Sequence, residues 1–171
     1  GTQHRVSVET TFPGGDLEYY RLSYTASAYV PLSKYFTYKV KASLDYGDGY
    51  GNTEVLPFYK NFYAGGSNSV RGYRARSLGP TDIGGPDPTL TVGGSKRVLG
   101  NTELLFPFPG MADNKTMRLS VFVDAGMVYG ADQDADLGEL RYGAGLAFNW
   151  FSPIGPLSIS FALPLNDQLG D

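Results

Sequence analysis

The sequence predicts an all-β protein, an antiparallel transmembrane β-barrel segment of about seven meandering strands with one long lumen-docking loop. Apolar and polar residues alternate with a period of two in one segment after another, which is typical of strands with one apolar and one polar face. Several of these segments reach about ten residues, the length that a tilted strand needs to cross a bilayer. The chain of 171 residues also contains 23 glycines and 13 tyrosines, which suits tight turns and a membrane interface.

The alternation is clearest in residues 20–30, where Leu22 lies on an apolar face and Arg21 on a polar face. Residues 118–126 repeat the pattern, with Phe122 as the one bulky side chain on the polar face. The remaining strands that we expect have the same alternation, at residues 5–10, 36–46, 98–106, 141–150 and 157–162.

A soluble β-sandwich and a membrane barrel can both use such strands, and two features favour the barrel. Sandwich strands are commonly only about five or six residues long, shorter than several of the runs in this chain. Aromatic residues also collect at the ends of the runs, where headgroups would meet hydrocarbon: Tyr19, Tyr20, Tyr35, Phe36, Tyr46, Tyr129, Tyr142, Trp150 and Phe151. The apolar faces are therefore expected to contact lipid, and the polar faces to line the lumen.

Composition and motifs exclude several other classes of protein. The formal net charge of -3 gives no reason to expect nucleic acid as a partner. The chain has no cysteine, which excludes disulfides and thiolate metal sites, and no run of about 18 apolar residues that would form a transmembrane helix. We expect no metal, no cofactor and no enzymatic activity, because the acidic residues 132, 134 and 136 lack the glycine and final glutamate of a calcium loop and no Gly-x-Ser-x-Gly motif occurs.

The links between the expected strands alternate in length. Short links with proline and glycine, expected on the periplasmic side, occupy residues 31–34, residues 107–110 onward, and residues 152–156. The opposite ends have longer connections, and the longest is the loop of about fifty residues at 47–96, a length that is usually functional or disordered. Within it, Val70-Arg71-Gly72-Tyr73 offers a cation, a residue free to adopt positive φ and an aromatic anchor.

This loop motif, together with Phe122-Val123-Asp124-Ala125-Gly126 and residues 150–157, resembles the BamA-type outer-membrane protein assembly factors. Their superfamily also includes TamA and the two-partner-secretion transporters. The resemblance covers nearly all of residues 1–171, as the C-terminal half of a barrel of about sixteen strands. It implies that the loop folds back into the lumen, and that the periplasmic POTRA domains and the final strand are absent from this chain.

The resemblance also implies a latch, in which Val70, Arg71, Gly72 and Tyr73 dock on the wall and Arg71 pairs with Glu103 and Asp124. Alternation independently points both carboxylates inward, since Glu103 is out of phase with Leu104, and Asp124 with Val123. The resemblance implies further that neighbouring residues of the same motifs support the latch: Gly65, Gly66, Phe122 and Gly126.

The function implied is that of a non-enzymatic insertase, which folds client β-barrel proteins into the outer membrane of a Gram-negative bacterium without nucleotide. The expected partners are the lipid bilayer, client barrels, and accessory assembly lipoproteins that bind through the absent POTRA domains. The alternative is a translocation pore of the two-partner-secretion or TamA type, in which the same loop plugs a channel. The number of POTRA repeats would discriminate the two.

About seven strands would leave two unpaired sheet edges in hydrocarbon, at a cost of several kcal/mol for each exposed backbone group. We therefore expect the isolated chain to self-associate in detergent. The mass of the protein–detergent complex tests this expectation, and a monomer with a closed barrel would contradict it.

Overall fold

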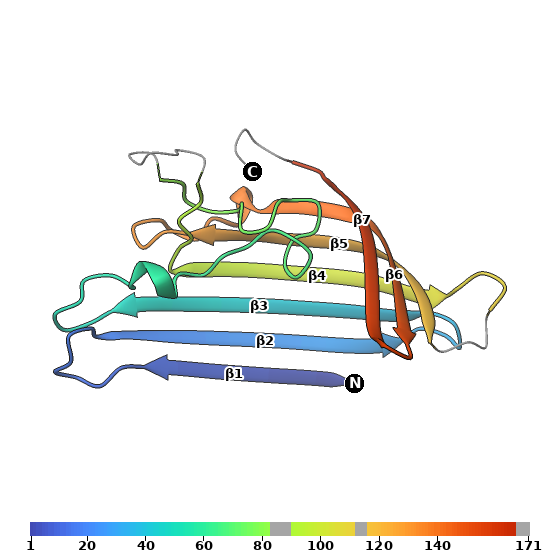
Figure 1. The fold of residues 1–171 in the computed structure, drawn as a ribbon, viewed down its shortest axis with the longest axis horizontal. Coiled ribbons are helices and arrows are strands. Elements are labelled where there is room, and N and C mark those ends of the chain that lie inside the picture. The colour runs from blue at the N-terminus through green and yellow to red at the C-terminus, as the bar shows by residue number, and fades with distance from the viewer. Residues whose placement is uncertain (83–89, 112–115, 167–171) are drawn as a thin grey trace.

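A computed structural model describes residues 1–82, 90–111 and 116–166. It contains one antiparallel sheet in which the seven strands follow one another in chain order (Figure 1). The strands are β1 (Thr2–Thr10), β2 (Tyr19–Pro31), β3 (Thr37–Gly49), β4 (Lys96–Pro107), β5 (Met117–Tyr129), β6 (Arg141–Ser152) and β7 (Gly155–Pro164). The predicted all-β meander of about seven strands is thereby confirmed. The sheet is open between β1 and β7, as expected for part of a barrel.

Two short 3-10 helices, η1 (Phe58–Lys60) and η2 (Leu137–Glu139), lie in the connections. Within the described ranges, no helix is long and apolar enough to cross a membrane.

The two faces of the sheet have opposite character, as the alternation predicts. Leu44, Val123 and Leu146 are 51%, 46% and 55% exposed, because no protein covers the outer face. The inner residues Ser120 and Asp124 are almost completely buried. An uncovered apolar face on strands of 9 to 13 residues is what lipid contact requires.

Register places the inner residues of neighbouring strands in rows across the sheet. Lys41 of β3 lies beside Asn101 of β4, which lies beside Asp124 of β5, which lies beside Gly143 of β6. The adjacent row contains Lys39, Glu103 and Phe122, among other residues. Inward groups that are far apart in the sequence therefore become immediate neighbours on one wall.

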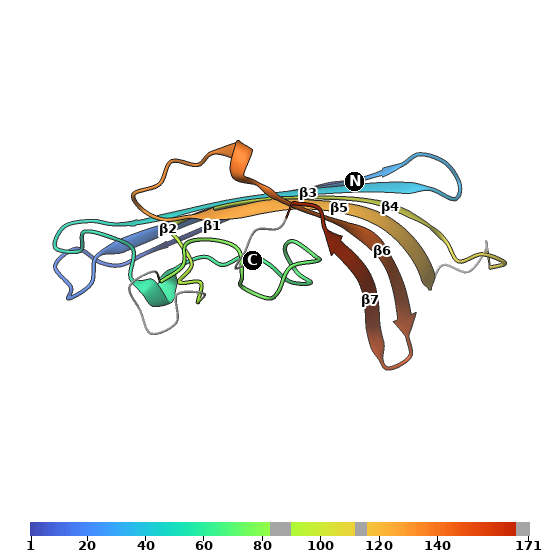
Figure 2. The same cartoon turned by 90° about the horizontal axis from the view of Figure 1, so that it is seen from above.

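The connection between β3 and β4 lies on the side toward which β5, β6 and β7 curve (Figure 2). It occupies residues 50–95 rather than 47–96, because β3 continues to Gly49 and pairs there with Tyr19. The loop has its own internal pairing, with isolated bridges between Phe62 and Gly94 and between Ala64 and Leu78. Its described residues, 50–82 and 90–95, thus have defined pairing, although the sequence of the loop has no long alternating run.

An apolar cluster fixes the loop to the wall. Val70 and Leu78 of the loop are completely buried against Leu99 of β4 and Val128 of β5. Burial of a valine or leucine side chain stabilises by about 1.5 to 3 kcal/mol. Burial of these side chains therefore supplies much of the free energy that holds the loop on the sheet. Polar contacts of the loop set its position.

Candidate functional site

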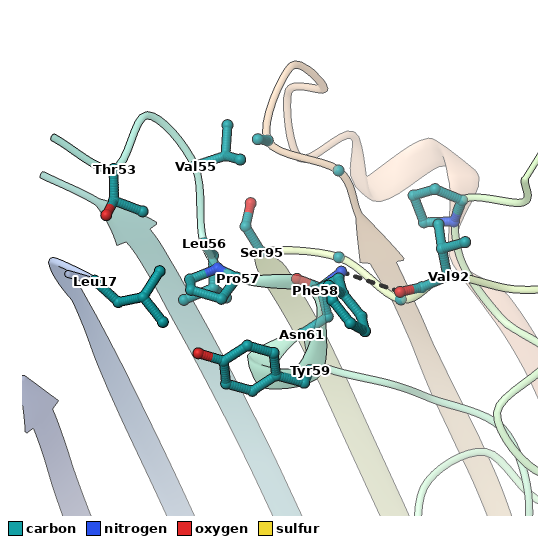
Figure 3. Close-up of a pocket in the computed structure, with 15 residues that line it drawn as sticks. Leu17, Thr53, Val55, Leu56, Pro57, Phe58, Tyr59, Asn61, Val92 and Ser95 are labelled. Atoms are coloured by element: carbon teal, nitrogen blue, oxygen red, sulfur yellow. Dashed lines mark hydrogen bonds between the residues drawn. The ribbon is translucent and has the colours of Figure 1, made fainter.

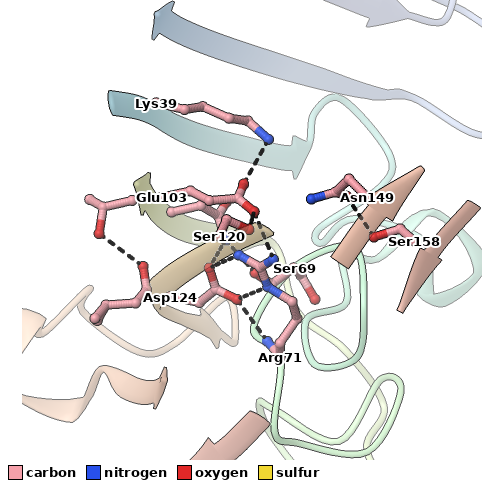
Figure 4. Close-up of polar contacts among 11 residues, drawn as sticks. Lys39, Ser69, Arg71, Glu103, Ser120, Asp124, Asn149 and Ser158 are labelled. Carbon is pink, nitrogen blue, oxygen red and sulfur yellow. Dashed lines mark hydrogen bonds and ion pairs between the residues drawn. The ribbon is translucent and has the colours of Figure 1, made fainter. Parts of the chain in front are cut away.

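The centre of the loop contact is an ion pair between Arg71 and Asp124 (Figure 4). The Arg71 Nε atom lies 2.6 Å from Asp124 Oδ2, and Nη2 lies 2.8 Å from Oδ1. The backbone N–H of Arg71 also donates to Oδ2 at 3.1 Å. Two parallel bonds from a guanidinium fix direction as well as distance. Because the Asp124 side chain is 0% exposed, Arg71 supplies the charge that this buried carboxylate requires.

Glu103 completes the charge cluster beside this pair. Its Oε1 atom lies 3.6 Å from Arg71 Nη1 and accepts a hydrogen bond of 2.6 Å from the Ser120 hydroxyl. Its other oxygen accepts a hydrogen bond of 3.1 Å from Lys39 Nζ. The structure thus brings together the three residues expected to form the latch and adds Lys39 and Ser120. The two cations and two carboxylates leave the cluster without net charge.

Two further inward side chains shape the position of Arg71. Asn101 donates from Nδ2 both to Asp124 Oδ1, at 2.9 Å, and to the backbone oxygen of Ser69, at 2.7 Å. The centre of the Arg71 guanidinium lies 3.4 Å from the centroid of the Phe122 ring, so a cation–π contact reinforces the ion pair. Phe122 is therefore the platform under the arginine, which accounts for a bulky aromatic residue on the polar face.

The other residues of the motif fix the loop backbone. Val70 packs in the apolar cluster, and the Tyr73 hydroxyl lies 3.2 Å from both the backbone oxygen of Tyr142 and Asn166 Oδ1. Gly72 has a φ of 101°, which L side chains rarely adopt. The motif thus places one apolar, one charged and one aromatic contact within four residues.

The expected supporting glycines also lie at this contact. Gly65 and Gly66 lead into the turn that precedes the motif, where the N–H of Gly66 donates to the oxygen of Val70 at 3.1 Å. Gly126 of β5 lies under the loop, and a Cβ atom there would come within 2.9 Å of Val70 Cγ2 and 2.5 Å of Leu99 Cδ2. These three glycines allow the loop to turn and to approach the wall closely.

Sequence reasoning missed Gly143 of β6, where the loop backbone comes close to the backbone of the sheet. A Cβ atom at this position would lie 1.9 Å from the backbone oxygen of Arg71. The sequence did contain a signal, because Gly143 and Gly145 lie two residues apart and so share the inner face of one strand. Glycine within a strand often marks close approach of another backbone.

The part of the loop at residues 58–62, the stem, has a second attachment to the sheet that sequence reasoning also missed. Two guanidinium groups contact the ring of Phe62, that of Arg21 at 4.5 Å and that of Arg97 at 5.5 Å from its centroid. Nearby, Lys60 forms an ion pair of 2.5 Å with Glu9 of β1. The stem is thus attached to the β1 side of the wall, whereas Arg71 is attached to β5.

The family model described as the Omp85 superfamily domain matches residues 1–171. The chain belongs to the Omp85 superfamily. Together with the bacterial relatives reported next, this membership gives the location of the protein, the outer membrane of a Gram-negative bacterium.

Named Omp85 relatives extend the comparison. The chain is 38% identical to the outer membrane protein assembly factor BamA of Neisseria meningitidis, over 97% of this chain and 24% of that protein. It is 27% identical to a SAM50-like protein of Schizosaccharomyces pombe, over 67% of this chain and 24% of that protein. The crystal structure of BamA from Haemophilus ducreyi lacking POTRA domains 1-3 matches with a TM-score of 0.91 and 34% identity, over 100% of this chain and 36% of that chain. The chain therefore spans about a quarter of the length of these sequence relatives.

A separate hollow of about 670 Å³ lies among the connections that join β1 to β2, β3 to β4 and β5 to β6 (Figure 3). Its lining is mostly apolar and includes Leu56, Phe58 and Val92. Beside it, the Glu18 carboxylate accepts hydrogen bonds from the backbone N–H groups of Gly14 and Asn52, at 2.6 and 2.7 Å. These bonds lower the pKa of Glu18 below its ordinary value, since they favour the charged form. The hollow is lined by different residues from those around Arg71.

Proposed function

We propose that this chain is the C-terminal half of the barrel of an outer-membrane insertase, which folds and inserts client β-barrel proteins without nucleotide. One observation supports this proposal above the others. This chain is 38% identical to a named assembly factor over 97% of its own residues. It also holds its Val-Arg-Gly-Tyr loop on the sheet through the Arg71–Asp124 pair.

The chemistry proposed is an exchange of hydrogen bonds. In such an insertase the barrel opens at the seam between its first and last strands, and client strands pair with the exposed edge. Thinning of the nearby bilayer by hydrophobic mismatch lowers the barrier further. The part of this chain in the process is the latch of Arg71, Glu103 and Asp124, which holds the lumenal loop in one position while the seam opens.

The partners proposed for the complete protein are the lipid bilayer, client barrels, and accessory lipoproteins bound through POTRA domains. The open edges of β1 and β7 also support self-association of the isolated chain, for which the mass measurement given above is the test. A translocation pore remains the second candidate, because a loop across the lumenal face suits a plug as well as a latch. The names of the relatives reported above favour assembly.

Substituting Arg71 by alanine in the complete protein is expected to reduce client assembly about tenfold or more, the effect of losing a charge-assisted bidentate contact. Arg71→Lys is expected to remain defective, because an ammonium group cannot make the two parallel bonds to Asp124. The measurement is the rate at which the purified protein in liposomes folds a β-barrel substrate, followed by the gel mobility of the folded product.

The matched control is Arg5→Ala, which removes an exposed arginine on β1. Assembly at the wild-type rate in Arg71→Ala, with the loop still in place, would dismiss the latch. A loss of assembly in Arg5→Ala of the same size would show that the effect is not specific to Arg71.

A further inference from the structure

A second, polar hollow lies between the loop and the inner faces of β2, β3 and β4. It has a volume of about 390 Å³, and the side chains of Thr25, Lys41, Ser43 and Arg97 line its wall side. The loop contributes the segment 65–69 and Arg76. A volume of this size accommodates on the order of a dozen waters, so a small ion with part of its hydration shell fits.

The side chains around this hollow carry an excess of positive charge. Arg97 is neutralised by Asp45, whose Oδ2 atom lies 2.9 Å from Arg97 Nη2. Lys41 and Arg76 have no carboxylate partner among the described residues, and the Arg76 guanidinium lies 5.2 Å from the centroid of the Tyr63 ring. Within the part of the chain that the structure describes, two cations of this hollow, Lys41 on β3 and Arg76 on the loop, therefore lack a counter-charge.

The backbone of Arg76 is a second and independent observation. Its φ of 63° makes it the one non-glycine residue with positive φ in the described part of the chain. Such a conformation is energetically unfavourable for a residue with a Cβ atom, and strained residues of this kind cluster at functional sites. A glycine would adopt the same conformation without strain, so the arginine side chain at this position is the feature that needs an explanation.

The turn at residues 66–69, which also lines the hollow, offers further donors. The N–H groups of Ser67 and Asn68 have no acceptor among the described residues, and both residues line the hollow. Thr25 and Ser43 add hydroxyl groups, 3.1 Å apart. Cations, backbone N–H groups and hydroxyls around one space are the donor set that binds phosphate oxygens.

We propose that this hollow is an oxyanion site that takes a phosphate group and connects the loop to the wall through Arg76 and Lys41. The bound anion would attach the loop on the β3 side, opposite the attachment of Arg71 to β5. The site is distinct from the Arg71 latch and does not depend on any client, so its existence is independent of the insertase function. The phosphate can be inorganic or belong to a lipid headgroup, since both present the same oxygens.

The experiment is a calorimetric titration of the complete protein in a detergent without phosphate, with inorganic phosphate replacing chloride at constant ionic strength. A parallel titration uses a short-chain phosphatidic acid below its micelle concentration. The variants are Lys41→Gln and Arg76→Gly, and the second keeps the positive φ without strain, so the loop fold is preserved. The control is Lys34→Gln, which removes one exposed positive charge in the turn between β2 and β3.

Saturable binding that weakens about tenfold or more in Lys41→Gln and in Arg76→Gly, and is unchanged in Lys34→Gln, is the expected result, because each variant loses a charge-assisted hydrogen bond. Tighter binding of inorganic phosphate would identify the free ion as the ligand, and tighter binding of phosphatidic acid would identify a lipid headgroup. Absence of saturable binding of either ligand, or equal binding in all three variants, would overturn the proposal. Client assembly is not part of the measurement, so its outcome is separate from that of the proposed function.

Discussion

Asp124→Asn is expected to lower the free energy of unfolding of the complete protein by about 3 kcal/mol, the lower end of the range for breaking a buried ion pair. The substitution preserves the shape of the side chain but removes the charge that neutralises Arg71. Glu103, 3.6 Å from Arg71, retains part of the compensation. Denaturant unfolding in lipid vesicles gives the free energy, and protease cleavage within residues 50–82 reports the position of the loop.

Asp16→Asn is the control for this prediction, because Asp16 is an exposed carboxylate in the connection before β2. It is expected to change stability by less than about 0.5 kcal/mol. Equal effects of the two substitutions, or a stable and protease-resistant loop in Asp124→Asn, would show that the buried pair does not hold the loop.

Gly143→Ala is expected to displace the loop although it adds only one methyl group. The new Cβ atom would lie 1.9 Å from the backbone oxygen of Arg71, and no side-chain rotation relieves a contact between a Cβ atom and a backbone. The expected loss of stability is about 3 kcal/mol, the upper part of the usual range for overpacking. Loop cleavage by protease and denaturant unfolding measure the two effects.

Gly100→Ala provides a closely matched comparison. Gly100 is also a strand glycine, two strands away in β4, and a Cβ atom there would have no neighbour within 4 Å. Its alanine variant is expected to keep the loop docked and the stability unchanged or slightly raised, because alanine is less flexible when unfolded. If Gly143→Ala behaved like Gly100→Ala, the close approach of Arg71 to β6 would be wrong.

The strands and their two faces could be predicted from the sequence because alternation has a physical cause. Leu44 and Val123 must face lipid, and Asp124 must not, so each strand carries its orientation in its own residues. The strand ends were harder to predict. Gly47, Asp48 and Gly49 resemble a turn, but they continue β3 by pairing with β2.

Much of the site depends on information that single strands do not contain. Asn101 contacts Asp124 because the register of β4 and β5 places them opposite each other, and alternation alone leaves register open. Phe62 contacts both Arg21 and Arg97 because of the path of the loop. The partners of Arg71 were expected from the resemblance of the motifs, whereas Lys39, Ser120 and Gly143 required the folded sheet.

Hydrogen exchange of the loop in the complete protein, in lipid and in buffer without phosphate, tests the central claim that Arg71 docks on Asp124. The N–H of Arg71 donates to the buried Asp124 carboxylate, whereas the N–H groups of Ser67 and Asn68 have no acceptor among the described residues. The account predicts that the Arg71 amide exchanges about a hundredfold or more slowly than those two. Exchange of all three at the same rate would contradict the docked loop.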